Sequence, residues 1–193
     1  LTADNFRFAR QAGATHIVAH LTNYFGSDDE LSTGSGAQSW GVAGDGKTLW
    51  TYEELHDLRT AVNAAGLELA ALENFNPAHW YDVLLDGPRR AEQMSNIKTM
   101  ICNMGKAGIP CMGYNFSIAG VWGRVNGNWA RGDAESVGFL GPDGPAETPI
   151  PNGEVWNMIY NPQAPTGTIG QVTEAQLWDR LTRFLDEVVP VAE

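Results

Sequence analysis

Residues 109–116, IPCMGYNF, decide how this chain is interpreted. The stretch is short and mostly apolar until Tyr114 and Asn115, where it becomes polar and aromatic. A buried strand that ends in hydrogen-bonding side chains is typical of an α/β sheet, whose sites lie at the carboxyl ends of its strands. The stretch therefore predicts a parallel strand with a polar end.

Two earlier parts of the chain have the same form. A helical run closed by Ala-Gly precedes residues 109–116, and the same dipeptide comes just before THIVAHL at 15–21 and LELAAL at 67–72. Glycine is favoured just past a helix, because it takes the left-handed conformation without a Cβ penalty. Three such units predict alternating helices and parallel strands.

Capping patterns and apolar spacing predict four helices, at residues 2–12, 51–65, 88–107 and 173–189. The second and fourth open with TYEE and TEAQ, which have the form of a capping box. Apolar residues three and four positions apart give each helix a face to bury. We interpret residues 77–87, which contain His79, Trp80 and Tyr81, as a linker.

Two long segments interrupt this pattern, at residues 22–50 and 117–171. The first is rich in Gly, Ser and Asp, and a loop of that length in a compact domain is commonly functional. The second is too aromatic for a plain disordered linker.

These elements predict an α/β fold in which residues 1–193 form one domain, part of a (β/α)8 TIM barrel with about three strands and four helices. A complete barrel has eight strands and about 250 residues. The strands expected before the first helix and after the last are missing from the sequence. We therefore expect either the N-terminal portion of a larger barrel or a second polypeptide that supplies the rest.

The composition disfavours several classes of partner. The formal net charge of −11 argues against nucleic acids and anionic membranes, because both need basic patches. No run approaches the roughly 18 apolar residues of a membrane span, so we expect a cytoplasmic protein, with a homo-oligomer left open. We expect Cys102 and Cys111 to be buried small hydrophobic residues, because they fall in a predicted helix and strand.

Polar side chains follow each predicted strand, and parallel neighbours would gather them on one rim. Such a rim suits a polyhydroxylated ligand, because each hydroxyl needs a donor or an acceptor. The alternative is that these side chains cap helices and satisfy loop backbones. The residues are His20, Asn23, Glu73, Asn74, Asn76, Tyr114 and Asn115.

The segment after the third strand adds candidates for binding an acid. Arginine matches a carboxylate bidentately, so Arg124 could bind a sugar acid. Trp122 and Trp129 either stack on sugar C–H faces or hold the segment in place. A surface ion pair is the alternative for Arg124 and the favoured interpretation of Arg131, which lies near Asp133.

Local metal and phosphate motifs are absent from the sequence. It contains no HExxH or CxxC spacing and no glycine-rich phosphate loop, and its one HxxxH spacing, HIVAH at 16–20, falls in a predicted strand. We expect His16, at the start of its strand, to be structural and His56, in a helix, to be solvated. His79, in the predicted linker, has no assigned place.

The sequence resembles the mannonate dehydratase family, which is similar to xylose-isomerase-type TIM barrels. The resemblance spans most of the chain except the two long segments. Its most specific part is Tyr114-Asn115-Phe116 followed by Trp122 and Arg124. The segments that contain it are RQAGATHIV, LWTYEELHDLRTAVNAAGLELAALE, GKAGIPCMGYNF, VWGR and the terminal EVVPVAE.

This resemblance implies a hydro-lyase of glucuronate catabolism that converts D-mannonate to 2-keto-3-deoxy-D-gluconate and water. The family uses a divalent metal, typically Mn²⁺, with a base for the C2 proton and an acid for the C3 hydroxyl. Its metal ligands correspond to positions beyond residue 193, so we assign none here. Tyr114, Asn115 and Arg124 carry over as substrate-side residues.

One departure leaves the substrate open. The family has two adjacent histidines after its second strand and then a link containing PNGEVW, whereas here the strand ends HLTN at 20–23 and a similar PNGEVW lies at 151–156. We therefore keep three interpretations. They are the dehydratase, a sugar isomerase or epimerase on the same barrel, and a carbohydrate-binding or scaffold protein without catalysis.

Overall fold

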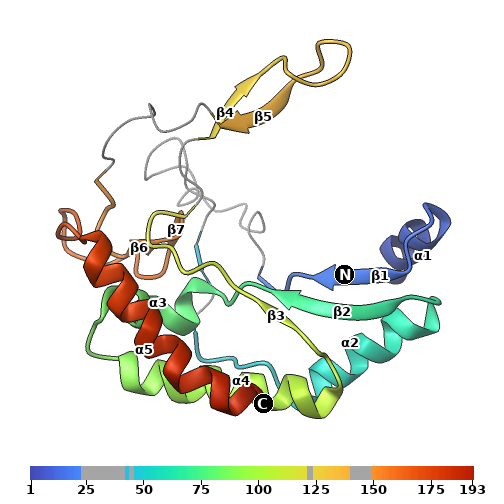
Figure 1. Cartoon of the computed structure of the whole chain (residues 1–193), viewed down its shortest axis with the longest axis horizontal. Coiled ribbons are helices and arrows are strands. Elements are labelled where there is room, and N and C mark those ends of the chain that lie inside the picture. The colour runs from blue at the N-terminus through green and yellow to red at the C-terminus, as the bar shows by residue number, and fades with distance from the viewer. Residues whose placement is uncertain (23–41, 44–45, 121–123, 140–148) are drawn as a thin grey trace.

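The computed structural model describes residues 1–22, 42–43, 46–120, 124–139 and 149–193. Within them helices and strands alternate through the first half of the chain (Figure 1). The elements are α1 Ala3–Gln11, β1 His16–Ala19, α2 Tyr52–Ala64, β2 Glu68–Glu73, α3 Pro77–Leu85, α4 Arg90–Ala107, β3 Met112–Gly113, β4 Arg124–Gly127, β5 Ser136–Phe139, β6 Glu154–Val155, β7 Met158–Ile159 and α5 Glu174–Ala192.

The central sheet has the order β1-β2-β3, and both pairs are parallel. The carboxyl ends of the three strands therefore lie at one edge, as the sequence predicted. The register runs from His16 opposite Glu68 to Ala19 opposite Leu72, and it shifts between Ile17 and Val18. Because four positions of β1 then face five of β2, β2 contains one extra residue, a β-bulge.

Helices cover one face of this sheet. Leu69 and Leu72 of β2 are buried in one cluster with Leu55 of α2 and Met104 of α4. On the other face Val18 of β1 is 55% exposed. The sheet is therefore half-covered, and Figure 1 shows α2, α4 and α5 along the same side of it.

A second core joins α3, α4 and α5 beyond the end of the sheet. Trp80 is at its centre, with its ring centroid 5.5 Å from Phe75, 5.8 Å from Phe116 and 5.7 Å from Phe184 of α5. The other buried members are Val83, Leu84, Met94, Ile97, Met100, Ile118, Val155 and Val188. The last helix is thus held by aromatic packing as well as by its apolar stripe.

The linker predicted at residues 77–87 was wrong, because most of it forms α3. Asn76 caps this helix by accepting a hydrogen bond from Ala78 N at 2.9 Å, and Pro77 occupies its first turn. Trp80 has non-helical backbone angles inside the helix, and nearly every α3 residue is buried. Because the helix is buried on nearly all sides, its sequence lacks the alternation of apolar and polar faces, with a period of 3.6 residues, that indicates a helix.

The other predicted helices are confirmed within a few residues. Thr51 and Thr173 both form the expected capping boxes, with Glu54 and Gln176 as their partners. The last helix continues past the predicted end, through Pro190 to Ala192.

Two β-hairpins lie in the long segment 117–171. β4 pairs with β5 and β6 with β7, both antiparallel. Trp129 lies against Gly127 and Gly138, where an added Cβ would be 2.5 Å from its ring, and the indole is still 52% exposed. Figure 1 shows the β4–β5 hairpin standing away from the sheet and helices.

The prediction that both cysteines are buried was wrong. Cys102 and Cys111 are exposed. Cys102 lies on α4 beside its buried stripe, and Cys111 precedes β3, which is only two residues long. Because β3 is so short, few neighbouring residues bury the position that immediately precedes it.

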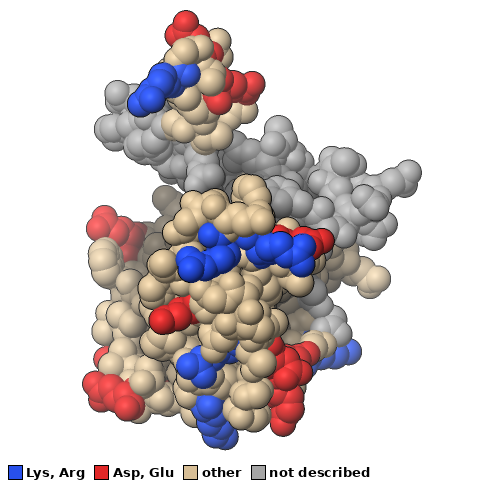
Figure 2. Space-filling view, turned by 90° about the vertical axis from the view of Figure 1, so that its right-hand side faces the viewer, with Lys and Arg blue, Asp and Glu red and all other residues tan. Residues whose placement is uncertain are grey.

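Two arginines lie near glycines that follow other helices: Arg10 of α1 is near Gly66 after α2, and Arg59 of α2 is near Gly108 after α4. A Cβ on Gly66 would be 3.5 Å from Arg10 Nε, and one on Gly108 would be 3.0 Å from Arg59 Nη1. The negative end of a helix dipole favours a cation at that place. Figure 2 shows charges of both signs interspersed on the right-hand side of the molecule in Figure 1.

Ion pairs fix the position of α5 on α4. Glu187 accepts hydrogen bonds from Lys98 Nζ at 2.7 Å and from Arg90 Nη1 at 2.9 Å. These bonds hold the pKa of Glu187 below its ordinary value of 4.5. None of the helices in the described ranges is both long and apolar enough to cross a bilayer.

We predict that Glu187→Gln lowers the unfolding free energy at pH 7 by no more than ~1 kcal/mol, because the pair is partly exposed. A carboxylate with a lowered folded-state pKa stabilises the fold above its unfolded pKa of about 4.5, and this stabilisation is lost as the pH falls further. The difference between wild type and variant should therefore shrink between pH 5 and pH 3 in urea titrations. Asp186→Asn removes a neighbouring exposed charge and should show no such trend.

Candidate functional site

Two of the predicted rim residues meet at the carboxyl edge of the sheet. His20 follows β1 and Glu73 ends β2, and the His20 Nε2 to Glu73 Oε2 distance is 3.2 Å. Both side chains are about half exposed, at 41% and 46%. An imidazole and a carboxylate side by side can donate to and accept from ligand hydroxyls and can exchange a proton.

His16 also has a carboxylate partner, at the opposite edge of the same two strands. Its Nε2 lies 3.3 Å from Glu68 Oε2, and its Nδ1 lies 2.8 Å from Thr15 Oγ1. This edge carries the amino ends of the strands. In a TIM barrel, residues on that side serve stability and not catalysis. The location fits the structural role predicted for His16, and His56 is exposed on α2 as expected.

Tyr114 lies apart from this pair. Its ring centroid is 5.1 Å from Phe184 and 6.3 Å from Trp80, so the ring packs at the margin of the aromatic core. Burial raises the pKa of its phenol above the ordinary value of 10.0, so the hydroxyl is a neutral donor at physiological pH. Tyr114 remains 37% exposed, and the adjacent Asn115 is exposed.

Two asparagines follow β2, at positions 74 and 76. Asn74 is buried in a left-handed conformation with φ 65°, and its N–H donates to Gly113 O at 2.8 Å. Asn76 caps α3 through its side-chain oxygen. For Asn76, the alternative that its side chain caps a helix was right.

The predicted residues of the long segments are only partly placed. Asn23 and Trp122 lie outside the described residues, and of Arg124 only the backbone, at the start of β4, is described. Arg131 and Trp129 are exposed near the turn that joins β4 to β5. The roles predicted for Arg124 and Trp122 therefore stay predictions.

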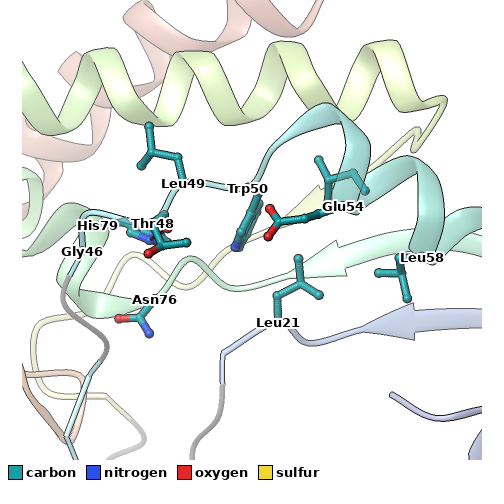
Figure 3. A pocket seen from close by; sticks show the side chains of 10 residues that line it. Leu21, Gly46, Thr48, Leu49, Trp50, Glu54, Leu58, Asn76 and His79 are labelled. Carbon is teal, nitrogen blue, oxygen red and sulfur yellow. Dashed lines mark hydrogen bonds between the residues drawn. The ribbon is translucent and has the colours of Figure 1, made fainter.

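A pocket of about 430 Å³ lies beside the carboxyl edge, behind the ends of β1 and β2. Figure 3 shows Leu21, from the loop after β1, pointing toward the carboxylate of Glu54 on α2, with Trp50 beside them. That carboxylate accepts hydrogen bonds from Thr51 N at 3.0 Å and Thr51 Oγ1 at 2.9 Å. Glu54 is the only Asp, Glu, Lys or Arg side chain among the described residues that line the pocket, and its carboxylate disfavours an anionic ligand there.

His79 is the residue that sequence reasoning could not place. It is 6% exposed on α3, its Nε2 lies 3.0 Å from Thr48 O, and its ring meets Trp50 edge-on at 6.1 Å. It joins the segment before α2 to α3 and lines the pocket. A capping signal at Asn76-Pro77 was present in the sequence and could have placed it on a helix.

Within the described ranges, no three His, Cys, Asp or Glu side chains are arranged to hold a metal ion. His20 and Glu73 supply two potential donors, one fewer than the three protein ligands of a catalytic zinc site. The described residues therefore do not fit a metal centre by themselves.

The comparison with protein families identifies this chain. Residues 8–141 match the model of the family described as D-mannonate dehydratase (UxuA). The chain belongs to the D-mannonate dehydratase family. The mannonate dehydratase of Streptococcus equi subsp. zooepidemicus is 34% identical over 152 residues, which cover 75% of this chain and 41% of that protein.

Other members of the D-mannonate dehydratase family match a similar share of their length to this chain. The Streptococcus pneumoniae enzyme is 32% identical over 152 residues, and mannonate dehydratase 2 of Halalkalibacterium halodurans is 26% identical, covering 44% of that protein. The chain thus spans about two fifths of the length of the curated relatives it matches.

A solved structure shares the fold. The crystal structure of mannonate dehydratase from Streptococcus suis serotype 2 aligns with all of this chain and with 45% of its own length, with a TM-score of 0.62 and 24% identity. This likeness supports the α/β architecture with its parallel sheet.

We predict that the Tyr114 ring, not its hydroxyl, contributes to stability. Tyr114→Phe should change the unfolding free energy by less than about 0.5 kcal/mol, because the contacts with Phe184 and Trp80 remain. Tyr114→Ala should lower it by about 2 kcal/mol, less than the loss for a fully buried aromatic residue. Chemical denaturation measures both, and equal losses in the two variants would contradict the prediction.

Proposed function

We propose that this chain is the N-terminal portion of a (β/α)8 barrel of the xylose-isomerase type. Part of such a barrel contains consecutive parallel strands with helices on one face, and this chain has three such strands. The likeness to the Streptococcus suis structure over 45% of its length supports the same conclusion. In a barrel the uncovered face of the sheet would line the interior.

The proposed reaction of the complete protein is dehydration of D-mannonate. The C2–H bond breaks and its proton passes to a base, the C3–O bond breaks and the hydroxyl leaves as water, and the resulting enol becomes 2-keto-3-deoxy-D-gluconate. Membership of the D-mannonate dehydratase family, with more than two thirds of the chain inside the matched range, is the observation that supports this proposal.

The residues of this chain would act on the substrate side. His20 and Glu73 stand at the carboxyl edge, where a barrel enzyme holds its ligand, and they can bind hydroxyl groups. Tyr114 and Asn115 lie at the end of the third strand, and Arg124 and Trp122 follow in the next segment. A guanidinium pairs well with the carboxylate of a sugar acid, which is the role proposed for Arg124.

A divalent metal, Mn²⁺ by analogy with the family, is proposed as the cofactor, with ligands outside this chain. It would lower the energy of the negative charge that develops when the C2 proton leaves. The described residues supply no complete set of ligands for it. A cytoplasmic location and a homo-oligomer remain predictions.

We predict that the complete protein with Mn²⁺ converts D-mannonate to 2-keto-3-deoxy-D-gluconate. The product can be quantified as a 2-keto-3-deoxy acid and identified by mass, which falls by one water. A sugar isomerase or epimerase would instead yield a product of unchanged mass. Binding of the acid without any turnover would favour the non-catalytic interpretation.

We also predict that Arg124→Ala raises the KM for D-mannonate about tenfold or more, the loss expected when a charge-assisted hydrogen-bonded pair is removed. Arg131→Ala is the matched control, because it removes an exposed arginine from the same hairpin. Steady-state kinetics on both variants tests this, and an equal KM in wild type and Arg124→Ala would refute the role of Arg124.

A further inference from the structure

Two histidine–carboxylate pairs join the same two strands. His16–Glu68 lies at the amino edge with 3.3 Å between Nε2 and Oε2, and His20–Glu73 lies at the carboxyl edge with 3.2 Å between the same atoms. The pairs have the same chemistry and similar geometry. They differ in their position along the sheet, and only the second stands where a ligand of a parallel sheet binds.

The β-bulge is what brings the second pair together. The histidines are four residues apart, so both lie on one face of β1, because side chains alternate along a strand. The glutamates are five residues apart, which in a regular strand would place them on opposite faces. The register shift makes Ala70 an extra residue of β2, between Leu69 and Ala71. Both glutamates then lie on the same face of the sheet as His16 and His20.

Bulges are frequent next to active sites, where they re-aim a side chain, and they are rare in parallel pairs. This one re-aims Glu73. An exposed ion pair contributes little to stability, and a bulge disrupts the ladder, so the pair does not account for the bulge as a stabilising contact. A requirement for the Glu73 carboxylate on the uncovered face does account for it.

The neighbouring strand leaves this carboxylate accessible. Gly113 of β3 is the partner of Glu73 in the register, and a Cβ added to it would lie 3.6 Å from Glu73 Cγ. A larger side chain there would stand beside the carboxylate on the open face. The glycine therefore leaves room for a ligand next to the His20–Glu73 pair.

We propose that Glu73 is a positioning residue, aimed by the bulge, which holds the His20 imidazole against a hydroxyl of the sugar acid. The carboxylate accepts the Nε2 proton of His20 and so fixes both the ring orientation and the tautomer. This inference rests on the proposed function, and it assigns separate roles to two residues of its site. His20 contacts the substrate, and Glu73 acts through His20.

The test compares Glu73→Gln with Glu68→Gln in the complete protein with Mn²⁺. Both substitutions remove one carboxylate charge from one His–Glu pair on the same strands, so general effects on charge and folding are matched. We expect Glu73→Gln to lower kcat about tenfold to a hundredfold. This is the range found when a carboxylate that orients a metal-binding histidine is removed. The KM should change less than about threefold, because substrate contacts remain. Glu68→Gln should change neither constant by more than about twofold.

A variant that keeps the negative charge distinguishes a positioning role of Glu73 from a purely structural one. Glu73→Asp retains the carboxylate and should recover part of the lost kcat, while the melting temperatures of all three variants should agree within a few degrees. Equal kinetic effects of Glu73→Gln and Glu68→Gln would overturn the inference, as would an active Glu73→Gln with unchanged kcat. A wild-type protein that does not dehydrate D-mannonate would instead overturn the proposed function, and the role of Glu73 with it.

Discussion

Parallel pairing of β1, β2 and β3 is the constraint on which the rest of this structure depends. Each parallel connection must return the chain to the same edge, so a helix has to cross over the sheet between successive strands. α2 and α4 make these crossings and bury Leu69 and Leu72 beneath them. One face is thereby covered, and the residues that end the strands gather at one edge of the other.

The second core shows how the chain extends beyond the sheet. Trp80 and Phe184 bring α3 and α5 together, and Glu187 adds polar contacts from α5 to α4. The burial is mostly aromatic, which gives large contact area from few residues. Tyr114 borders this core, so the residue that follows β3 is in contact with the last helix.

Sequence patterns predicted the features that are encoded locally. Ala-Gly helix ends, the capping boxes at Thr51 and Thr173, and the polar strand ends each depend on a few adjacent residues, and the structure contains them. α3 was missed because Trp80 breaks its period and burial surrounds it. The partner of Glu73 could not be derived either, because the bulge that turns Glu73 toward His20 arises from the pairing of two strands, which no single segment specifies.

The indole of Trp129 lies on the bare backbone of Gly127 and Gly138, one from each strand of its hairpin. Any side chain at either glycine would occupy the space of the ring, so the three positions are not free to diverge independently. Among related sequences, a residue larger than glycine at 127 or 138 should coincide with loss of the tryptophan. Co-variation of these three positions would therefore record whether a relative has kept this hairpin.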